Sequence, residues 1–299
     1  MAIDTSPFKE LYPFASHWHH LEDQLKYHYL DEGEGENLLM LHGNPSWSFY
    51  YRNLVSSFKS NYRCIVPDHI GCGLSDKPQD YNYTLSQHIN NLESLVDKLE
   101  LRNLTLIVHD WGGAIGMGLA ARRPELIRRF VIFNTAAFLS TEIPFSINIC
   151  RIPIFGDIAI RMFNAFAIGA VYRASKNRRR MTSKVKSGYL APYNSYENRI
   201  ANLRFVQDIP MSPANASYKT VREIEEKLEI FKEHPMLIVW GRKDFCFNDH
   251  FLNRWKEYFP KAIVEVMEDA GHYVVEDAHE KIVPLLTSFL NSTQLQIPE

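Results

Sequence analysis

The sequence predicts an α/β fold: a mostly parallel sheet with helices on both faces and an inserted helical cap. The first observation is size, because 299 residues that are 45% apolar and 23% charged can bury a sizeable core. The second is that short apolar runs alternate with stretches of helical spacing, as in parallel sheets. The third is a helix-rich segment that interrupts this alternation. We therefore assign 1–137 and 216–299 to the core and 138–215 to the cap.

The first half of the chain alternates strands and helices. Each expected strand is a short apolar run followed by turn residues, and these runs are 38–41, 62–67, 104–108 and 129–134. The stretch 84–99 has apolar residues at helical spacing, and Thr84 is a plausible N-cap. A glycine-rich helix is expected at 112–122. These elements complete two strand-helix-strand crossovers.

The second half begins with the cap and then returns to the strand pattern. The cap is rich in Ile, Phe, Ala and Arg and has helical periodicity. Strands are expected at 235–241 and 262–267, with a closing helix at 278–290. An insertion into one sheet explains this order better than two domains in tandem.

The charge and cysteine content exclude several classes of function. With 33 Lys and Arg against 35 Asp and Glu, the net charge is −2, so the whole molecule does not gather nucleic acid or anionic lipid, and a charged partner must be met locally. The four cysteines are far apart without a CxxC pair, which indicates reduced thiols. The first residues do not resemble an export signal, and no apolar run reaches the ~18 residues of a membrane span. We expect a cytoplasmic protein.

Two patterns that suggest a cofactor or a metal have simpler structural explanations. Gly116, Gly118 and Ala121 fit a dinucleotide-binding pattern, but they fall inside the expected helix and not at the strand-helix turn where a pyrophosphate would sit. His17 and His19 share one face of an expected surface ribbon, without a carboxylate or cysteine nearby to complete a metal site. We expect no cofactor and no metal.

The candidate nucleophile is Asp110. Residues 104–116 read LTLIVHDWGGAIG, which is a buried strand, one polar residue at a sharp turn, small residues and then a helix. This is the nucleophile-elbow arrangement with aspartate where other members have serine, and Gly112 and Gly113 leave room for the neighbouring backbone. The amino terminus of the helix is expected to keep Asp110 ionised. Alone, the same pattern also describes an ordinary helix N-cap.

Two more residues at strand ends favour catalysis. Asp244 follows the strand at 235–241, and His272 follows the strand at 262–267. Nucleophile, acid and histidine in this chain order are typical of α/β-hydrolases, so we expect the three side chains to meet at one edge of the sheet. Each of them taken singly could be a turn residue or a loop histidine.

A carboxylate nucleophile restricts the substrate. Attack on a carbonyl would form an anhydride, which is costly, whereas attack on an sp3 carbon that carries a leaving group forms an ordinary ester. The candidate substrates are alkyl halides, epoxides and the ring carbon of a strained β-lactone. His272, held by Asp244, can then activate water against the ester and restore Asp110.

Two residues are candidates for stabilising the leaving anion. Asn44 follows the first buried strand in the sequence HGNPSW, and Trp111 is adjacent to Asp110. The Asn44 amide and the Trp111 indole N–H can converge on a departing anion, and the backbone N–H of Trp111 is the expected oxyanion donor. Core packing of Trp111 and a loop-fixing role for Asn44 are the alternatives.

Together these motifs resemble the haloalkane dehalogenases over nearly the whole chain. The matching stretches are HGNPSW, DHIGCGLSDKP, VHDWGG, WGRKDF and DAGHYVVED. The resemblance implies an α/β-hydrolase fold with Asp110 as nucleophile, His272 as base and Asp244 as acid, and it implies that Asn44 and Trp111 stabilise the halide. Some relatives carry the acid after the sixth strand, but NTAAF has no carboxylate there.

A narrower resemblance concerns SFYYRNL, NTAAF and the cap segment 191–213. These stretches resemble the dehalogenase homologues of bacterial long-chain olefin synthesis, which decarboxylate cis-dialkyl β-lactones to alkenes. Because both groups share the same five site residues, those residues do not decide between a haloalkane and a β-lactone.

Two other functions stay open. An epoxide hydrolase would share Asp110 and His272, and it resembles enzymes with an aromatic residue after His-Gly and two cap tyrosines. Here Asn44 follows His-Gly. The cap nevertheless contains Tyr172, Tyr189, Tyr193 and Tyr196. A non-catalytic ligand-binding member of the fold would have lost a triad residue, and none is lost.

The cap also has the composition of a docking surface. A basic run, for which a solvated helix face is the plainer interpretation, consists of Lys176, Arg178, Arg179, Arg180, Lys184 and Lys186. Beside it, 148–172 is strongly apolar. An apolar stretch next to a basic one can rest on a membrane surface or on a partner enzyme. We expect the cap to admit a hydrophobic small molecule with long alkyl chains.

Overall fold

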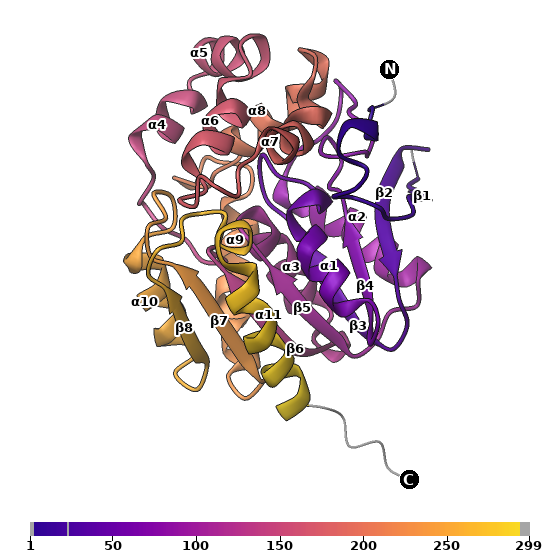
Figure 1. The fold of residues 1–299 in the computed structure, drawn as a ribbon. Helices are drawn as coiled ribbons and strands as arrows, with labels where there is room; N and C mark the ends of the chain where they lie inside the picture. The colour runs from indigo at the N-terminus through magenta and orange to yellow at the C-terminus, as the bar shows by residue number, and fades with distance from the viewer. Residues whose placement is uncertain (1–2, 23, 294–299) are drawn as a thin grey trace.

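A single sheet forms the centre of the computed structural model, which describes residues 3–22 and 24–293 (Figure 1). Among these residues the sheet has eight strands in the order β1-β2-β4-β3-β5-β6-β7-β8. β2 is antiparallel to both of its neighbours, β1 and β4, whereas all pairs from β4 to β8 are parallel. The mostly parallel sheet that the sequence predicts is confirmed.

The strands and helices have the following bounds. The strands are β1 His17–His20, β2 Lys26–Glu32, β3 Glu36–Leu41, β4 Tyr62–Pro67, β5 Leu104–Val108, β6 Ile127–Phe133, β7 Met236–Gly241 and β8 Ile263–Met267. The helices are α1 Arg52–Phe58, α2 Leu85–Lys98, α3 Trp111–Arg122, α4 Phe145–Asn148, α5 Pro153–Gly156, α6 Ala165–Arg173, α7 Ser183–Leu190, α8 Ile200–Gln207, α9 Tyr218–Lys227, α10 Asp249–Tyr258 and α11 Val274–Ser292.

Two apolar layers enclose the sheet, because alternate residues of each strand point to opposite faces. On β5, Leu106 and Val108 belong to the layer formed with α2, α3, α9 and α10, whereas Ile107 belongs to the layer formed with α1 and α11. Figure 1 shows α1 and α11 together in front of the sheet. Burial on both faces explains why these strands are short, nearly continuous apolar runs.

The ends of two helices test the sequence prediction. The side chain of Thr84 accepts a hydrogen bond from the backbone N–H of Gln87, which confirms it as the N-cap of α2. The closing helix predicted at 278–290 lies within α11, which in the structure spans Val274–Ser292. Ala278 has a non-helical φ of −139° and ψ of 21°, so the helical pattern read from the sequence begins at a break inside α11.

Residues 138–215 contain α4 to α8 and cover the edge of the sheet where β3 and β5 end (Figure 1). The prediction that the basic run forms one helix face is wrong. Its residues 176–180 lie in the turn between α6 and α7, and only Lys184 and Lys186 are on α7. The Asp277 carboxylate accepts the backbone N–H groups of Lys176 and Asn177. Because these N–H groups have a hydrogen-bond acceptor without being part of a helix, the segment is stable as a turn.

One part of the cap is attached to the core by buried polar contacts. Arg52 on α1 donates two hydrogen bonds to Glu276 on α11, at 2.7 and 2.8 Å. The hydroxyl of Tyr189 on α7 donates to the same carboxylate at 2.8 Å. The indole N–H of Trp47 donates to the carbonyl oxygen of Gly188, also on α7, at 2.9 Å. The charged, bidentate pair Arg52–Glu276 joins α1 to α11, and the hydrogen bonds of Tyr189 and Trp47 attach α7 to this part of the core.

Candidate active site

Asp110 lies at the sharp turn between β5 and α3. Its φ of 51° and ψ of −128° are unusual for a residue with a side chain. A Cβ on Gly112 would lie 2.0 Å from the carbonyl oxygen of Leu41, and a Cβ on Gly113 would lie 1.9 Å from Oγ1 of Thr135. Glycine is therefore required at both positions, because the neighbouring strand ends pack directly against the elbow.

Two backbone N–H groups donate to the carboxylate of Asp110. The N–H of Asn44 donates to Oδ1 at 2.7 Å, and the N–H of Trp111 is the second donor. A Cβ on Gly43 would lie 2.0 Å from the same Oδ1, so glycine is needed for this close approach. The sequence predicts the Trp111 donor. It does not predict the Asn44 donor, because the motif draws attention to the amide side chain and not to the backbone.

Asp244 and His272 complete the group around Asp110. Nδ1 of His272 is 2.9 Å from Oδ2 of Asp244, and Nε2 of His272 is 3.8 Å from Oδ2 of Asp110. The other oxygen of Asp244 accepts the backbone N–H of Cys246 at 2.6 Å. All three residues are buried. The structure thus brings the predicted nucleophile, acid and histidine together at one edge of the sheet.

The pKa values of Asp110 and His272 are both raised, for different reasons. Burial raises the pKa of Asp110, and the charge of His272 and the two N–H donors oppose it only in part. Burial alone would lower the pKa of His272, but the charge and hydrogen bond of Asp244, with the charge of Asp110, outweigh it. The Trp111 N–H at the helix terminus favours the ionised form, as the sequence analysis expects, although desolvation is the larger effect and moves the pKa of Asp110 upward.

These shifts predict the pH dependence of any reaction in which His272 activates water. As the pH falls through the raised pKa of His272, the imidazole becomes protonated and cannot accept a proton from water. We expect kcat for halide release to fall on the acid side, with a midpoint above the usual histidine pKa of 6.5. In Asp244→Asn the group that raises this pKa is gone. The midpoint should then move to lower pH and the plateau should fall about 100-fold or more, measured as halide release against pH. An unchanged midpoint would show that Asp244 does not set the pKa of His272.

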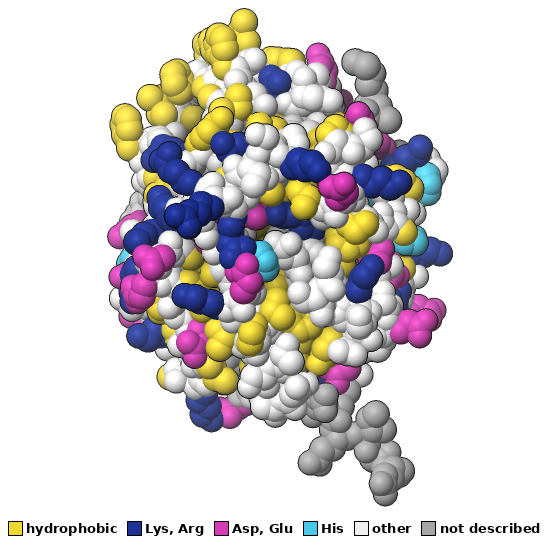
Figure 2. Space-filling model, viewed as in Figure 1, with side chains coloured by type: hydrophobic (Ala, Val, Ile, Leu, Met, Phe, Trp, Pro, Cys, Tyr) yellow, Lys and Arg dark blue, Asp and Glu magenta, His cyan; other side chains and the backbone are white. Residues whose placement is uncertain are grey.

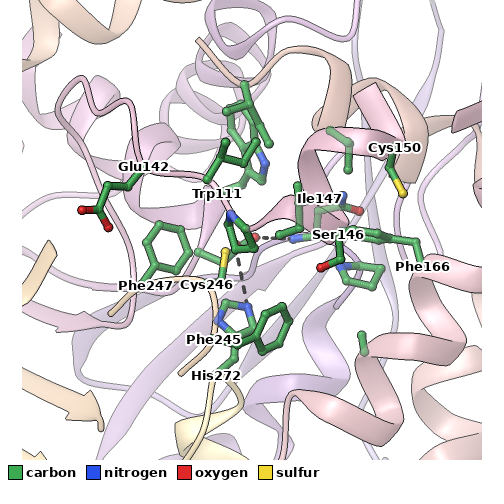
Figure 3. Close-up of a pocket in the computed structure, with 18 of the residues that line it drawn as sticks. Trp111, Glu142, Ser146, Ile147, Cys150, Phe166, Phe245, Cys246, Phe247 and His272 are labelled. Carbon is green, nitrogen blue, oxygen red and sulfur yellow. Dashed lines mark hydrogen bonds and ion pairs between the residues drawn. The ribbon is translucent and has the colours of Figure 1, made fainter. Parts of the chain in front are cut away.

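Asp110 and His272 open into a pocket of about 520 Å³ between the core and the cap. Figure 3 shows Phe245, Cys246 and Phe247 close to His272, and Ile147 and Phe166 from the cap on the right-hand side. The lining is largely apolar, and its charged or titratable side chains include Asp110, His272, Glu142 and Arg173. Such a pocket is suited to a hydrophobic small molecule.

Asn44 and Trp111 both line this pocket, and α8 helps to hold them. The Trp111 indole packs on Phe205, with the ring centroids 5.2 Å apart. The side-chain amide of Asn44 donates to the backbone carbonyl of Asn202 at 3.1 Å, which leaves one of its two hydrogens for an anion. The structure therefore brings Asn44 and Trp111 together, as predicted for the anion-stabilising pair. It also attaches both residues to the cap, which the sequence HGNPSW does not indicate.

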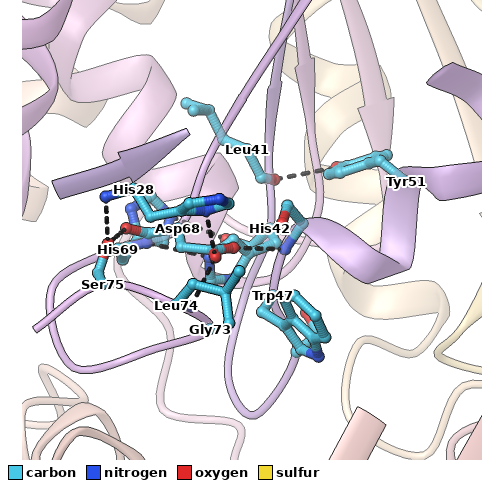
Figure 4. A network of polar contacts seen from close by, with 12 residues as sticks. His28, Leu41, His42, Trp47, Tyr51, Asp68, His69, Gly73, Leu74 and Ser75 are labelled. Carbon is cyan, nitrogen blue, oxygen red and sulfur yellow. Dashed lines mark hydrogen bonds and ion pairs between the residues drawn. The ribbon is translucent and has the colours of Figure 1, made fainter. Parts of the chain in front are cut away.

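A buried polar network holds the loop that carries Asn44 (Figure 4). Asp68, directly after β4, lies 2.8 Å from Nδ1 of His28 and accepts the backbone N–H of Ser48 at 2.7 Å. The ring of His42 accepts the backbone N–H of His69 at 3.1 Å. Both ends of the loop between 42 and 48 are thus fixed to the neighbouring strand end, which positions the Asn44 N–H against Asp110.

Two residues that the sequence analysis does not single out support the triad. Nε2 of His109 is 2.8 Å from the carbonyl oxygen of His272, and burial holds the pKa of His109 well below its usual value, so the neutral ring donates this hydrogen bond. Asn134 occupies the strand end where NTAAF lacks a carboxylate. It exchanges hydrogen bonds of 2.7 and 3.1 Å with the backbone of Gly241, which fixes the end of β7 that leads to Asp244.

The cap tyrosines do not provide the polarising pair of an epoxide hydrolase. Tyr193 and Tyr196 donate their hydroxyl hydrogens to protein groups at 3.1 and 2.8 Å, Tyr189 is bonded to the core, and Tyr172 is exposed. In the part of the chain that the structure describes, none of the four lines the pocket. The geometry therefore does not favour epoxide hydrolysis.

Similarity to known proteins agrees with this geometry. A family profile described as alpha/beta hydrolase fold matches residues 36–155. The chain is 49% identical to the cis-3-alkyl-4-alkyloxetan-2-one decarboxylase of Shewanella oneidensis, over 95% of this chain and 91% of that protein. It is 30% identical to haloalkane dehalogenase 2 of Mycobacterium tuberculosis, over 94% of this chain and 97% of that protein. The chain belongs to the haloalkane dehalogenase family of α/β-hydrolases.

Two further comparisons are consistent with the dehalogenase family. The cis-3-alkyl-4-alkyloxetan-2-one decarboxylase of Xanthomonas campestris is 45% identical, over 89% of this chain and 93% of that protein. The crystal structure of a putative ancestral haloalkane dehalogenase has a TM-score of 0.85 at 24% identity, covering 93% of this chain and 99% of that one. At that identity the structural likeness shows the fold alone. The enzyme is thus a dehalogenase-family member that is more similar in sequence to these β-lactone decarboxylases.

Proposed function

We propose that this enzyme converts cis-dialkyl β-lactones into alkenes and carbon dioxide, with Asp110 as the nucleophile. The observation that carries the proposal is a carboxylate at a nucleophile elbow, at the end of an apolar pocket and 3.8 Å from His272. A carboxylate attacks an sp3 carbon more readily than a carbonyl, because the product is an ester and not an anhydride. The two relatives at 49 and 45% identity are named for decarboxylation of cis-3-alkyl-4-alkyloxetan-2-ones, which are β-lactones.

In the first step Asp110 attacks the sp3 ring carbon that is bonded to the ring oxygen, and not the carbonyl carbon. The ring C–O bond breaks, its electron pair stays on the oxygen, and an ester of Asp110 with a β-carboxylate forms. Attack from the side opposite the ring oxygen inverts this carbon, so the new C–O bond lies anti to the carboxylate. The side-chain amide of Asn44 and the indole N–H of Trp111 can stabilise the released carboxylate.

In the second step the carboxylate leaves as carbon dioxide. The electron pair of the broken C–C bond forms the double bond, and the C–O bond to Asp110 breaks and restores its carboxylate. Because inversion is followed by anti elimination, the two alkyl groups stay on the same side and a cis lactone gives a cis alkene. Neither water nor a proton is consumed in this cycle.

The same site also supports haloalkane hydrolysis as a second activity, and one feature favours it. His272 and Asp244 form a hydrogen-bonded base and acid, at 2.9 Å, that the decarboxylation cycle does not use. A haloalkane leaves no carboxylate on the ester of Asp110, so that ester can only be removed by water that His272 activates. Asn44 and Trp111 would hold the departing halide.

A paired assay tests the proposed function. The purified enzyme is given a cis-dialkyl β-lactone and a terminal bromoalkane of matched chain length, and alkene and halide are measured separately. We expect a cis alkene from the lactone, with a higher kcat/KM than that of halide release. Halide release without alkene would overturn the lactone proposal in favour of dehalogenation, and a trans alkene would contradict the inversion step.

We further propose that the reaction is the last step of an olefin-forming route. A β-lactone of this type arises by closing a β-hydroxy acid, so an enzyme of that reaction class must supply the substrate. Neighbouring genes for thiolase-like, reductase-like and lactone-forming enzymes would support this position.

A further inference from the structure

The outer surface of the cap concentrates exposed apolar side chains. Among the described residues thirteen large apolar side chains are exposed, and all but Trp18, Ile230 and Ile263 come from 145–196. We define the cap patch as six of them that are 45 to 81% exposed, namely Phe145, Ile154, Phe155, Met162, Phe163 and Tyr172. Figure 2 shows hydrophobic side chains gathered at the top of the molecule, where Figure 1 places α5. Exposed apolar side chains gathered on one part of a surface mark an interaction site.

Four of the six residues of the cap patch lie on two helical segments that meet at a sharp bend, Phe163 lies at the bend, and Phe145 is on α4. No single described helix is long and apolar enough to cross a membrane, but Pro153–Met162 and Ala165–Arg173 meet the length and composition criteria as a pair bent by 69°. The inner face of this pair is packed on the protein through Ile160 and Val171, which are buried. A one-sided, bent apolar surface is suited to lying in the interfacial region of a bilayer and not to crossing it.

Positive charge adjoins the cap patch. Residues 145–190 contain nine Lys and Arg and a single Asp, in a chain whose net charge is −2. Nζ of Lys186 lies 4.4 Å from the ring centroid of Tyr172, so the basic run borders the patch directly. Figure 2 shows Lys and Arg side chains in a band just below the hydrophobic ones. An apolar patch bordered by cations complements a bilayer with anionic headgroups, because each nearby cation adds attraction.

The cap patch is also continuous with the pocket. Phe145 and Phe155 line the pocket and are at the same time 81 and 45% exposed. The pocket therefore reaches the surface at the patch. A lipophilic molecule dissolved in a bilayer against this surface can reach the pocket without passing through water.

We propose that the cap patch docks this enzyme on the surface of a bilayer that contains anionic phospholipid. The apolar side chains of the patch enter the interfacial region, and the basic run contacts the headgroups. Docking itself does not depend on the reaction. Uptake of the lactone directly from the bilayer is a consequence that rests on the proposed function.

Vesicle flotation of the full-length protein tests the docking. The wild type is expected to float with phosphatidylcholine vesicles that contain phosphatidylglycerol, and less with phosphatidylcholine alone. The variant Ile154→Ser/Met162→Ser/Phe163→Ser is expected to bind at least about tenfold more weakly, because it removes exposed apolar area that lipid would cover. None of these three residues lines the pocket. The matched control Ile230→Ser/Ile263→Ser, which also removes exposed apolar side chains, should bind like the wild type.

A charge variant separates headgroup attraction from apolar contact. Arg178→Gln/Arg179→Gln, which are exposed in the turn after α6, should weaken binding to anionic vesicles about tenfold and leave binding to neutral vesicles unchanged. Lys256→Gln/Lys281→Gln removes two exposed charges outside the cap and serves as the control. Equal loss in both double variants would overturn a specific role of the basic run.

Three outcomes would overturn the docking. In the first, the wild type floats with neither kind of vesicle. In the second, the serine variant floats as well as the wild type. In the third, the wild type binds no vesicles and is a dimer, and the serine variant is a monomer. The last outcome would assign the patch to contact between two copies of the chain. Because flotation needs no turnover, a failed docking result and a failed alkene assay are distinguishable.

Uptake of the lactone from the bilayer has its own test. The serine variant should have a lower rate than the wild type on a long-chain lactone held in vesicles and the same rate on a short-chain lactone in solution.

Discussion

Asp110→Asn is expected to abolish both alkene formation and halide release, with kcat at least about 10⁵-fold below that of the wild type. The amide is too weak a nucleophile to form the ester. When catalytic residues act together, removing the nucleophile removes most of the rate enhancement of the enzyme. The variant should still fold. Burial raises the pKa of Asp110 above that of an exposed carboxyl, so the ionised group reduces stability above its pKa, and a neutral amide there should leave Tm unchanged or higher.

The control for this prediction is Asp80→Asn, an exposed aspartate before α2, which should keep wild-type rates. Alkene and halide are measured in the same preparations, and Tm is measured to show that Asp110→Asn is folded. Retained alkene formation in a folded Asp110→Asn protein would show that the carboxylate does not attack the substrate.

His272→Gln is expected to separate the two reactions. With a bromoalkane the variant should release about one halide per enzyme and then stop, since the ester of Asp110 has no base to activate water, and steady turnover should fall about 10³-fold or more. With a cis-dialkyl β-lactone it should keep a rate within about tenfold of the wild type, because that cycle moves no proton. Mass spectrometry should find the alkyl group on the Asp110 peptide only after incubation with the bromoalkane.

His20→Gln, an exposed histidine on β1, is the matched control and should behave like the wild type in both assays. If His272→Gln stops alkene formation as well, the water-free cycle is wrong and the lactone route needs the imidazole. A halide burst without an adduct on Asp110 would assign the nucleophile to another group.

The parts of the site that the sequence predicts are those fixed by local chemistry. Asp110, Asp244 and His272 each follow a short apolar strand, and the ends of parallel strands meet at one edge of a sheet whatever the lengths of the connections. The elbow is predictable because Gly112 and Gly113 are required by the close approach of Leu41 and Thr135. Although Leu41 and Thr135 come from other strands, the residues that they constrain stand next to each other after a strand and therefore leave a pattern in the sequence.

The remaining features depend on contacts between distant segments. The upward pKa shift of Asp110 comes from its burial in the folded protein, which outweighs the local helix terminus. The bond from Asn44 to Asn202 joins residues 158 positions apart, and no motif contains both. The basic run lies in a turn because Asp277, a hundred residues further along the chain, accepts its backbone N–H groups. Tertiary contacts of this kind have no signal in composition or periodicity.

The attachment of α7 through Arg52, Glu276 and Tyr189 divides the cap into two parts with different freedom to evolve. A change of the anchored part would leave a buried core group with one hydrogen bond fewer, because Tyr189 donates to Glu276 and the Gly188 carbonyl accepts from Trp47, and such a loss is destabilising. The segment 143–173 contributes mainly pocket lining and exposed surface. Substrate range and surface affinity can therefore diversify through this segment alone, and it is the natural unit for grafting between relatives.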